Sequence, residues 1–150
     1  MKIISLGNIL RGDDGIGPAI LQELRDSNLG MDFELLDAGA DAFFVLEYLI
    51  QKEPLLIIDC AQMGKEAGDF VIFPVEKSNF ETLSSAISIH GFSFAEIYKM
   101  ALSLGDVAPC TIIGIEPKSI NFNEGLSDEV RRSIPLIINF IIGEAKKNAA

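Results

Sequence analysis

A strand, a glycine-rich loop and the start of a helix follow one another in residues 2–21, KIISLGNILRGDDGIGPAIL. The apolar run at 2–6 predicts the first strand, 7–15 a loop and 17–27 a helix. Pro18 falls in the first turn of that helix, where its missing N–H costs nothing. A strand that leads through a tight loop into a helix is the first half of a βαβ unit, from which parallel α/β sheets are built.

The rest of the chain continues this alternation of short apolar runs with helix-length segments. We expect further strands at 33–36, 55–58, 69–74 and 111–115, and helices at 43–50, from 94 onward and from 127 onward, where Pro135 either kinks the last helix or starts a second one. The 69–74 strand is expected to be antiparallel and at an edge, because the loop before it is too short for a crossover helix and Pro74 cannot donate to a ladder. The sequence thus predicts one domain, residues 1–150, with an α/β fold: a three-layer α/β/α sandwich around a five-stranded, mostly parallel twisted sheet with one antiparallel edge strand.

The composition excludes several classes of function. Of 150 residues 49% are hydrophobic, which is enough for a sizeable core, and 22 acidic against 12 basic residues give a formal net charge of -10. This charge repels phosphate backbones and anionic lipid, so nucleic acid and membrane partners are disfavoured. The longest apolar stretch, 134–143, is shorter than the roughly 20 residues that span a bilayer, and the first residues lack the pattern of a signal peptide. We therefore expect a cytoplasmic protein, with Cys60 and Cys110 reduced and buried.

Three chemistry-bearing residues stand where a strand ends or a helix is about to begin: Asp14, Asp59 and His90. Ligands in open α/β sheets bind outside the carboxyl ends of the strands, which is where the first and third strands place the two carboxylates. His90, the single histidine, comes just before Ser93-Phe94-Ala95-Glu96, a capping box that predicts the start of a helix. Two carboxylates and an imidazole suit a divalent transition metal and leave positions open for water or substrate, so this trio is a candidate metal site.

Other interpretations of these residues stay open. The acidic loop at 12–17 is also compatible with a tight turn whose carboxylates favour the start of the following helix. Asp37, 20 residues after Gly17, resembles the ribose-binding acid of a dinucleotide-binding domain, although Ile20 occupies the third glycine position of that motif. Cys60 could pair with His90 as a thiol nucleophile, and no G-x-S-x-G elbow of a serine hydrolase is present.

Four blocks of the chain resemble one known family in the same order and at similar spacing. GNILRGDDGIG (7–17) resembles a G-N-x-L-x-x-D-D/E-G-x-G block, LLIIDC (55–60) a strand that ends in an acid, SIHGFSFAEI (88–97) a histidine-plus-helix block, and IIGIEPKSINFNEGLSDEV (112–130) a G-I/V-x-P segment with its polar loop. This family is the hydrogenase maturation proteases, the nickel-dependent endopeptidases that process the large subunit of NiFe hydrogenases.

The resemblance implies roles for particular residues. The nickel-binding, catalytic residues of the family fall on Asp14, Asp59 and His90; many members have Glu at the first of these. The D-G-G-T turn, which contacts substrate, appears here as Asp37-Ala38-Gly39-Ala40, so Asp37 and Gly39 are the substrate-binding candidates. Asp13 is either a partner of the metal site or an ordinary acid at a helix start.

The function implied is removal of a short C-terminal peptide from the nickel-loaded precursor of a hydrogenase large subunit. The precursor would supply Ni²⁺ on its own cysteine thiolates, and the protease, acting as a monomer, would fill the open positions. Because only three harder ligands come from the protease, we expect it to hold nickel weakly by itself. Two alternatives remain: a non-catalytic assembly factor or metal chaperone that binds the precursor without shortening it, and a nucleotide-binding module.

Overall fold

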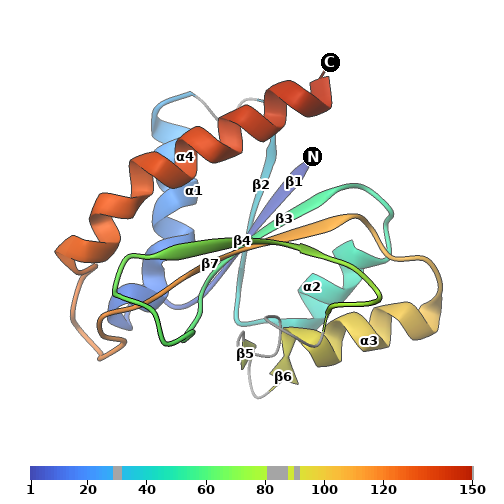
Figure 1. Cartoon of the computed structure of the whole chain (residues 1–150), viewed down its shortest axis with the longest axis horizontal. Coiled ribbons are helices and arrows are strands. Elements are labelled where there is room, and N and C mark those ends of the chain that lie inside the picture. The colour runs from blue at the N-terminus through green and yellow to red at the C-terminus, as the bar shows by residue number, and fades with distance from the viewer. Residues whose placement is uncertain (29–31, 81–87, 90–91, 150) are drawn as a thin grey trace.

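The computed structural model describes residues 1–28, 32–80, 88–89 and 92–149 and forms a sheet with helices on both faces (Figure 1). The sheet has five strands in the order β2-β1-β3-β7-β4. Their bounds are β1 Lys2–Leu6, β2 Glu34–Gly39, β3 Leu55–Cys60, β4 Phe70–Val75 and β7 Cys110–Ile115. The first three pairings are parallel, and β4 pairs antiparallel with β7 at the edge, with its Pro74 exposed. The predicted sheet, including the antiparallel edge strand, is confirmed.

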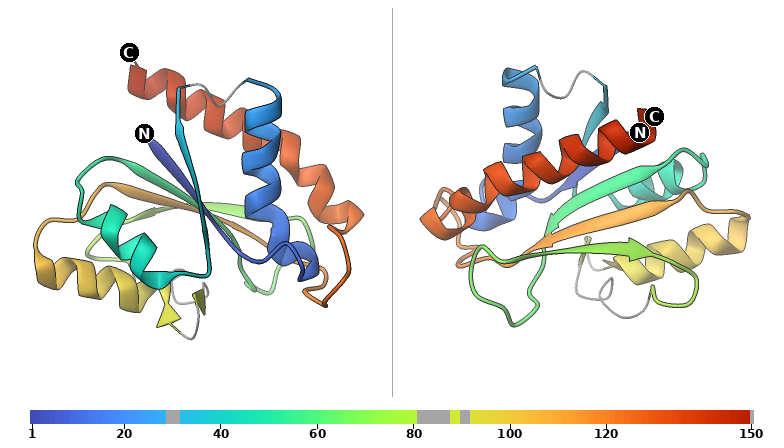
Figure 2. Two further views of the ribbon diagram at one scale, coloured as in Figure 1. Left: turned by 180° about the vertical axis from the view of Figure 1, so that it is seen from behind. Right: turned by 45° about the horizontal axis from the view of Figure 1, so that its top comes forward.

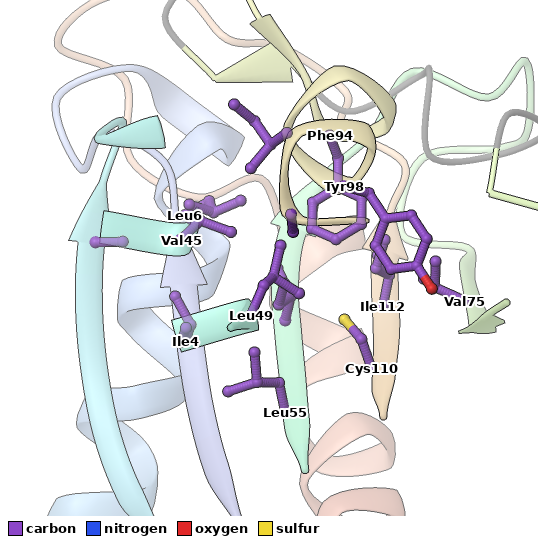
Figure 3. Close-up of a cluster of buried hydrophobic side chains, with 14 of the residues drawn as sticks. Ile4, Leu6, Val45, Leu49, Leu55, Val75, Phe94, Tyr98, Cys110 and Ile112 are labelled. Carbon is purple, nitrogen blue, oxygen red and sulfur yellow. The ribbon is translucent and has the colours of Figure 1, made fainter. Parts of the chain in front are cut away.

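Two pairs of helices cover the two faces of this sheet (Figure 2). Helices α1 (Ile16–Asp26) and α4 (Asp128–Ala149) lie on one face, and α2 (Ala42–Leu49) and α3 (Phe94–Leu104) on the other. Successive strand residues point to opposite faces, so β3 sends Leu56 and Ile58 into the core under α1 and α4, and Leu55 and Ile57 into the other core. Figure 3 shows this second core, with Phe94 and Tyr98 of α3 packed above the strands. The structure therefore has the three layers that the sequence predicts.

The segments around the strands differ from the prediction in four respects. The loop at 7–15 contains a 3-10 turn, η1 (Gly12–Gly15), which leads directly into α1. The second and third strands extend to Gly39 and Cys60, because their last residues continue to pair with β1 and with β7. Two short antiparallel strands were not predicted, because they are too short to leave a periodic signal: β5 (Ser88–Ile89) within the expected loop at 77–91 and β6 (Phe92–Ser93) directly after it. Finally, α4 continues through Pro135 as one helix.

Helix α1 lies unusually close to the sheet at Gly17. A Cβ atom added there would lie 2.8 Å from the carbonyl oxygen of Leu6 and 3.0 Å from that of Ile58, so only glycine allows this approach. Gly17 thus seats the start of α1 directly on the ends of β1 and β3. None of the helices in the described ranges is long and apolar enough to cross a membrane.

Candidate active site

Asp59 lies at the carboxyl end of β3, the central strand of the sheet. Its neighbours on both sides are paired strands, so its side chain is only 3% exposed. Its Oδ1 accepts a hydrogen bond of 2.7 Å from the backbone N–H of Cys60. Burial, and then the negative charge of Asp14, raise the pKa of Asp59 well above its usual value, and the Cys60 hydrogen bond only partly opposes them. This carboxylate is therefore costly to keep ionised unless a cation meets it.

Asp14 is brought beside Asp59 by the turn that follows β1. Gly7 has φ +118°, and a Cβ atom there would overlap the carbonyl oxygen of Asp14, so the chain can fold back this tightly only at a glycine. The backbone N–H of Asn8 donates to Asp14 Oδ2 at 2.8 Å and fixes the half-buried carboxylate. Asp14 lies close enough to Asp59 for its negative charge to raise the pKa of Asp59.

His90, the third predicted ligand, lies outside the described residues. The flanking strands β5 and β6 pair through Ser88 with Ser93 and through Ile89 with Phe92. The predicted capping box is present: Ser93 Oγ accepts from the N–H of Glu96 at 3.2 Å, and Glu96 Oε2 accepts from the N–H of Ser93 at 3.3 Å. Within the described residues no group of three or more histidine, cysteine or acidic side chains is placed to hold a metal, and the two aspartates are the part of the predicted set that the structure describes.

The predicted substrate-binding residues lie at the end of β2, next to the end of β1. Asp37 is exposed, and its Oδ1 accepts from the N–H of Gly39 at 3.0 Å and from Ser5 Oγ at 3.4 Å. Gly39 has φ +57°, and its carbonyl oxygen accepts from the N–H of Gly7 at 2.8 Å. The turn at Asp37 to Gly39 is thus tied to the loop that carries Asp14. Among the described residues, neither Asp37 nor Gly39 is hydrogen-bonded to the carboxylates of Asp14 and Asp59.

Asp13 has a structural task that the sequence left open. The side chain is 1% exposed and accepts four hydrogen bonds from the segment after β7. Its Oδ2 accepts from the N–H of Lys118 at 2.8 Å, the N–H of Ser119 at 3.3 Å and Ser127 Oγ at 2.9 Å, and its Oδ1 accepts from the N–H of Ser127 at 2.7 Å. Asp13 therefore ties the segment 118–127 to η1 and so to Asp14.

Glu116 is a third buried carboxylate, after Asp59 and Asp13, and it was not among the residues predicted from the sequence. It is 6% exposed, and its Oε1 accepts from the N–H of Met63 at 2.9 Å and of Lys65 at 2.6 Å. These bonds join the loop after β3 to the end of β7. Its position directly after a buried strand, like that of Asp59, is the signal in the sequence that could have indicated it.

The thiol of Cys60 does not have the properties of a nucleophile. Burial raises the pKa of this half-buried thiol far above its ordinary value, and the negative charges of Asp59 and Asp14 raise it further. The reactive form of cysteine is the thiolate, which this surrounding disfavours strongly. The geometry thus supports carboxylate chemistry at the end of β3.

Two adjoining hollows run along the segment after β7. One, of about 440 Å³, is lined by Asp13, Ser127 and neighbours, and the other, of about 510 Å³, by Glu116, Gln62 and neighbours; both include Lys118, Ser119 and Asn121. Both hollows lie beside the loops that Asp13 and Glu116 fix, and neither is lined by Asp14 or Asp59.

Comparison with known proteins identifies the family. The family model described as hydrogenase maturation protease matches residues 18–144, which is most of the chain. The chain belongs to the hydrogenase maturation protease family. The matched range includes Asp59 and the position of His90, while Asp14 precedes it.

Individual relatives align with this protease over most of their own lengths. A Methanocaldococcus jannaschii protein that bears the name of a hydrogenase maturation protease is 31% identical, and the alignment covers 95% of this chain and 86% of the relative. The hydrogenase maturating endopeptidase HybD from Escherichia coli shares the fold, with a TM-score of 0.79 at 22% identity over 99% of this chain and 94% of that one. HybD from Thermococcus kodakarensis, a NiFe hydrogenase maturation protease, has a TM-score of 0.73 at 27% identity, covering 97% and 99%.

Proposed function

We propose that this protease removes a short C-terminal extension from the nickel-loaded precursor of a NiFe hydrogenase large subunit, and that Asp14, Asp59 and His90 bind the nickel. The observation that carries the proposal is that two carboxylates, Asp14 in η1 and the buried Asp59 at the end of β3, lie close enough for the charge of one to act on the other. Among the described residues no ion pair includes Asp59, and the charge that raises its pKa is that of another anion, Asp14. A divalent cation would relieve both the burial and the repulsion.

The donor set fits nickel that arrives with the substrate. Two carboxylate oxygens and one imidazole nitrogen are ligands that divalent transition metals accept, and three ligands leave positions for thiolates of the precursor. His90 enters this set from its place in the sequence, between β5 and β6 and three residues before the cap of α3. Since the soft ligands belong to the substrate, the isolated protease is expected to bind Ni²⁺ weakly; tight stoichiometric binding in isothermal titration would contradict this.

The proposed reaction is hydrolysis of one peptide bond next to the bound nickel, which when present polarises the scissile carbonyl as a Lewis acid. Asp14 is half-buried and so can reach a water molecule, whereas Asp59 is closed off from solvent. Asp14 therefore accepts the proton of the attacking water as its oxygen bonds to the carbonyl carbon. The C–N bond then breaks, and the departing amine takes up the proton that Asp14 accepted, which leaves a new carboxyl terminus on the large subunit and returns Asp14 to its starting state.

Intact-mass spectrometry of a nickel-loaded precursor tests this function. The precursor is incubated with the wild-type protease, with Asp14→Asn and with Asp26→Asn, a control at the far end of α1 whose side chain bonds only Gln22 among the described contacts. We expect loss of a C-terminal peptide with wild type and Asp26→Asn, and no loss with Asp14→Asn or with nickel-free precursor. A precursor that binds wild type but keeps its mass would refute catalysis and favour the non-catalytic assembly factor.

A further inference from the structure

Three large apolar side chains beside the candidate site are exposed to solvent. Ile9 is 68% exposed, Leu10 58% and Phe122 66%. The first two lie in the loop after β1 and the third in the segment after β7, and the N–H of Asn123 donates to the carbonyl oxygen of Leu10 at 3.0 Å, which holds the two segments together. We call Ile9, Leu10 and Phe122 the apolar ridge. Exposed apolar side chains gathered in one place are characteristic of interaction sites.

The apolar ridge is fixed relative to Asp14. The residue before it, Asn8, donates its N–H to the Asp14 carboxylate, and the N–H of Asp14 donates to the carbonyl oxygen of Arg11 at 3.0 Å. Ile9 also lies against Gly15, where an added Cβ would come within 3.1 Å of the Ile9 Cα. A peptide bound at Asp14 would therefore have this ridge as its immediate neighbour.

Arg11 adds a positive charge to the ridge and has no anionic partner among the described residues. Its guanidinium lies over the ring of Phe122, with 5.3 Å from Cζ to the ring centroid. Its Nε is buried and has no hydrogen-bond acceptor, and no ion pair in the described part of the chain includes Arg11. The chain has 22 acidic residues, yet none in its described part pairs with the half-buried Arg11. Its buried Nε donor is therefore available to an acceptor oxygen of another molecule.

We propose that the apolar ridge and Arg11 form the surface that binds the hydrogenase precursor next to its cleavage site. Apolar side chains of the precursor pack on Ile9, Leu10 and Phe122, and an acceptor oxygen of the precursor, from a carboxylate or from the main chain, pairs with Arg11. This inference rests on the proposed function, because it takes the precursor as the occupant. The argument for that occupant is continuity: the ridge and Asp14 belong to one hydrogen-bonded loop.

Steady-state cleavage of the nickel-loaded precursor tests this binding surface. The rates are measured for the variants Arg11→Met and Phe122→Ala and for a control variant, Leu136→Ala. Leu136 is 60% exposed but lies on α4, away from the loop after β1. For each ridge variant we expect KM to rise about tenfold with kcat nearly unchanged, since arginine and aromatic residues dominate interface energies. The control should match wild type. Unchanged KM in both ridge variants, or a loss confined to kcat, would overturn the inference.

Two further measurements separate this inference from the proposed function. Arg11→Lys keeps the charge: partial rescue that weakens with salt indicates a precursor carboxylate, and no rescue indicates a main-chain oxygen held by the guanidinium geometry. If wild type leaves the precursor uncleaved, the proposed function fails, and biolayer interferometry of precursor binding still decides the ridge: affinity lost in Arg11→Met supports it, and unchanged affinity refutes it. A wild-type dimer in sedimentation that Phe122→Ala dissociates would show that a second copy covers the ridge instead.

Discussion

Replacing Asp13 by alanine is expected to destabilise the protease strongly, although Asp13 is absent from the proposed chemistry. The change leaves three backbone N–H groups and one hydroxyl without their acceptor. A buried donor without a partner costs about 1–3 kcal/mol. The hydroxyl of Ser127 can rotate and the Ser119 bond is long at 3.3 Å, so the two short bonds, from the N–H of Lys118 and of Ser127, dominate. We therefore expect a loss of about 3 kcal/mol.

The Asp13→Asn variant separates the instability caused by lost hydrogen-bond acceptors from the instability caused by lost side-chain volume. One carboxylate oxygen of Asp13 accepts three hydrogen bonds and the other accepts one, so an amide NH₂ faces an N–H donor in either orientation. The asparagine variant, although nearly isosteric, should lose about 2–3 kcal/mol. For a chain of this length, a loss of about 3 kcal/mol lowers Tm by roughly 10 °C.

Urea denaturation and thermal melting of both variants provide the measurement, with Asp26→Asn as an exposed control that should stay within about 0.5 kcal/mol of wild type. A double-mutant cycle of Asp13→Asn with Ser127→Ala should show coupling, because the two side chains share a hydrogen bond of 2.9 Å. An Asp13→Ala protein within about 1 kcal/mol of wild type would refute the reasoning, since it would mean that water reaches these donors at little cost.

Three further predictions concern the site and its support. Because the pKa of Asp59 is raised, the folded state holds more protons than the unfolded state between about pH 3.9 and the raised pKa, so the stability of the metal-free protein falls by up to about 1.4 kcal/mol per pH unit as pH rises through this window. The Asp59→Asn variant should lack this loss and be more stable than wild type in urea melts at neutral pH. A wild type whose stability is equal from acid to neutral pH would contradict this prediction. Cys60→Ala should keep its cleavage rate within about twofold, as its raised pKa excludes a thiolate, and a folded but inactive variant would restore the thiol mechanism. In thermal melts, the Gly17→Ala variant should lose about 1–3 kcal/mol of stability, because the added Cβ meets two carbonyl oxygens. The control Gly143→Ala, with nothing within 4 Å of the added Cβ, should gain about 0.5–1 kcal/mol, and equal effects of the two substitutions would argue against close packing at Gly17.

The sequence by itself determined the elements and most of their arrangement. Continuous apolar runs such as 55–58 predicted the strands, and Pro74 with its short preceding loop predicted the antiparallel edge. The capping box at Ser93 was equally readable, because its hydrogen bonds join residues only three positions apart. The proximity of Asp14 and Asp59 was also predictable, because the loops and strand ends at the carboxyl edge of a parallel sheet come together there. Their role as metal ligands stays a prediction.

Only the tertiary structure decided which other acids support the site. Asp13 stands next to Asp14 and is of the same type, yet its partners are 105 to 114 residues away along the chain. Glu116 likewise bonds the N–H groups of residues 53 and 51 positions before it. The pairing of Arg11 with Phe122 has the same origin. Periodicity and capping record interactions between near neighbours in sequence, whereas these contacts exist only after the sheet has brought its loops together.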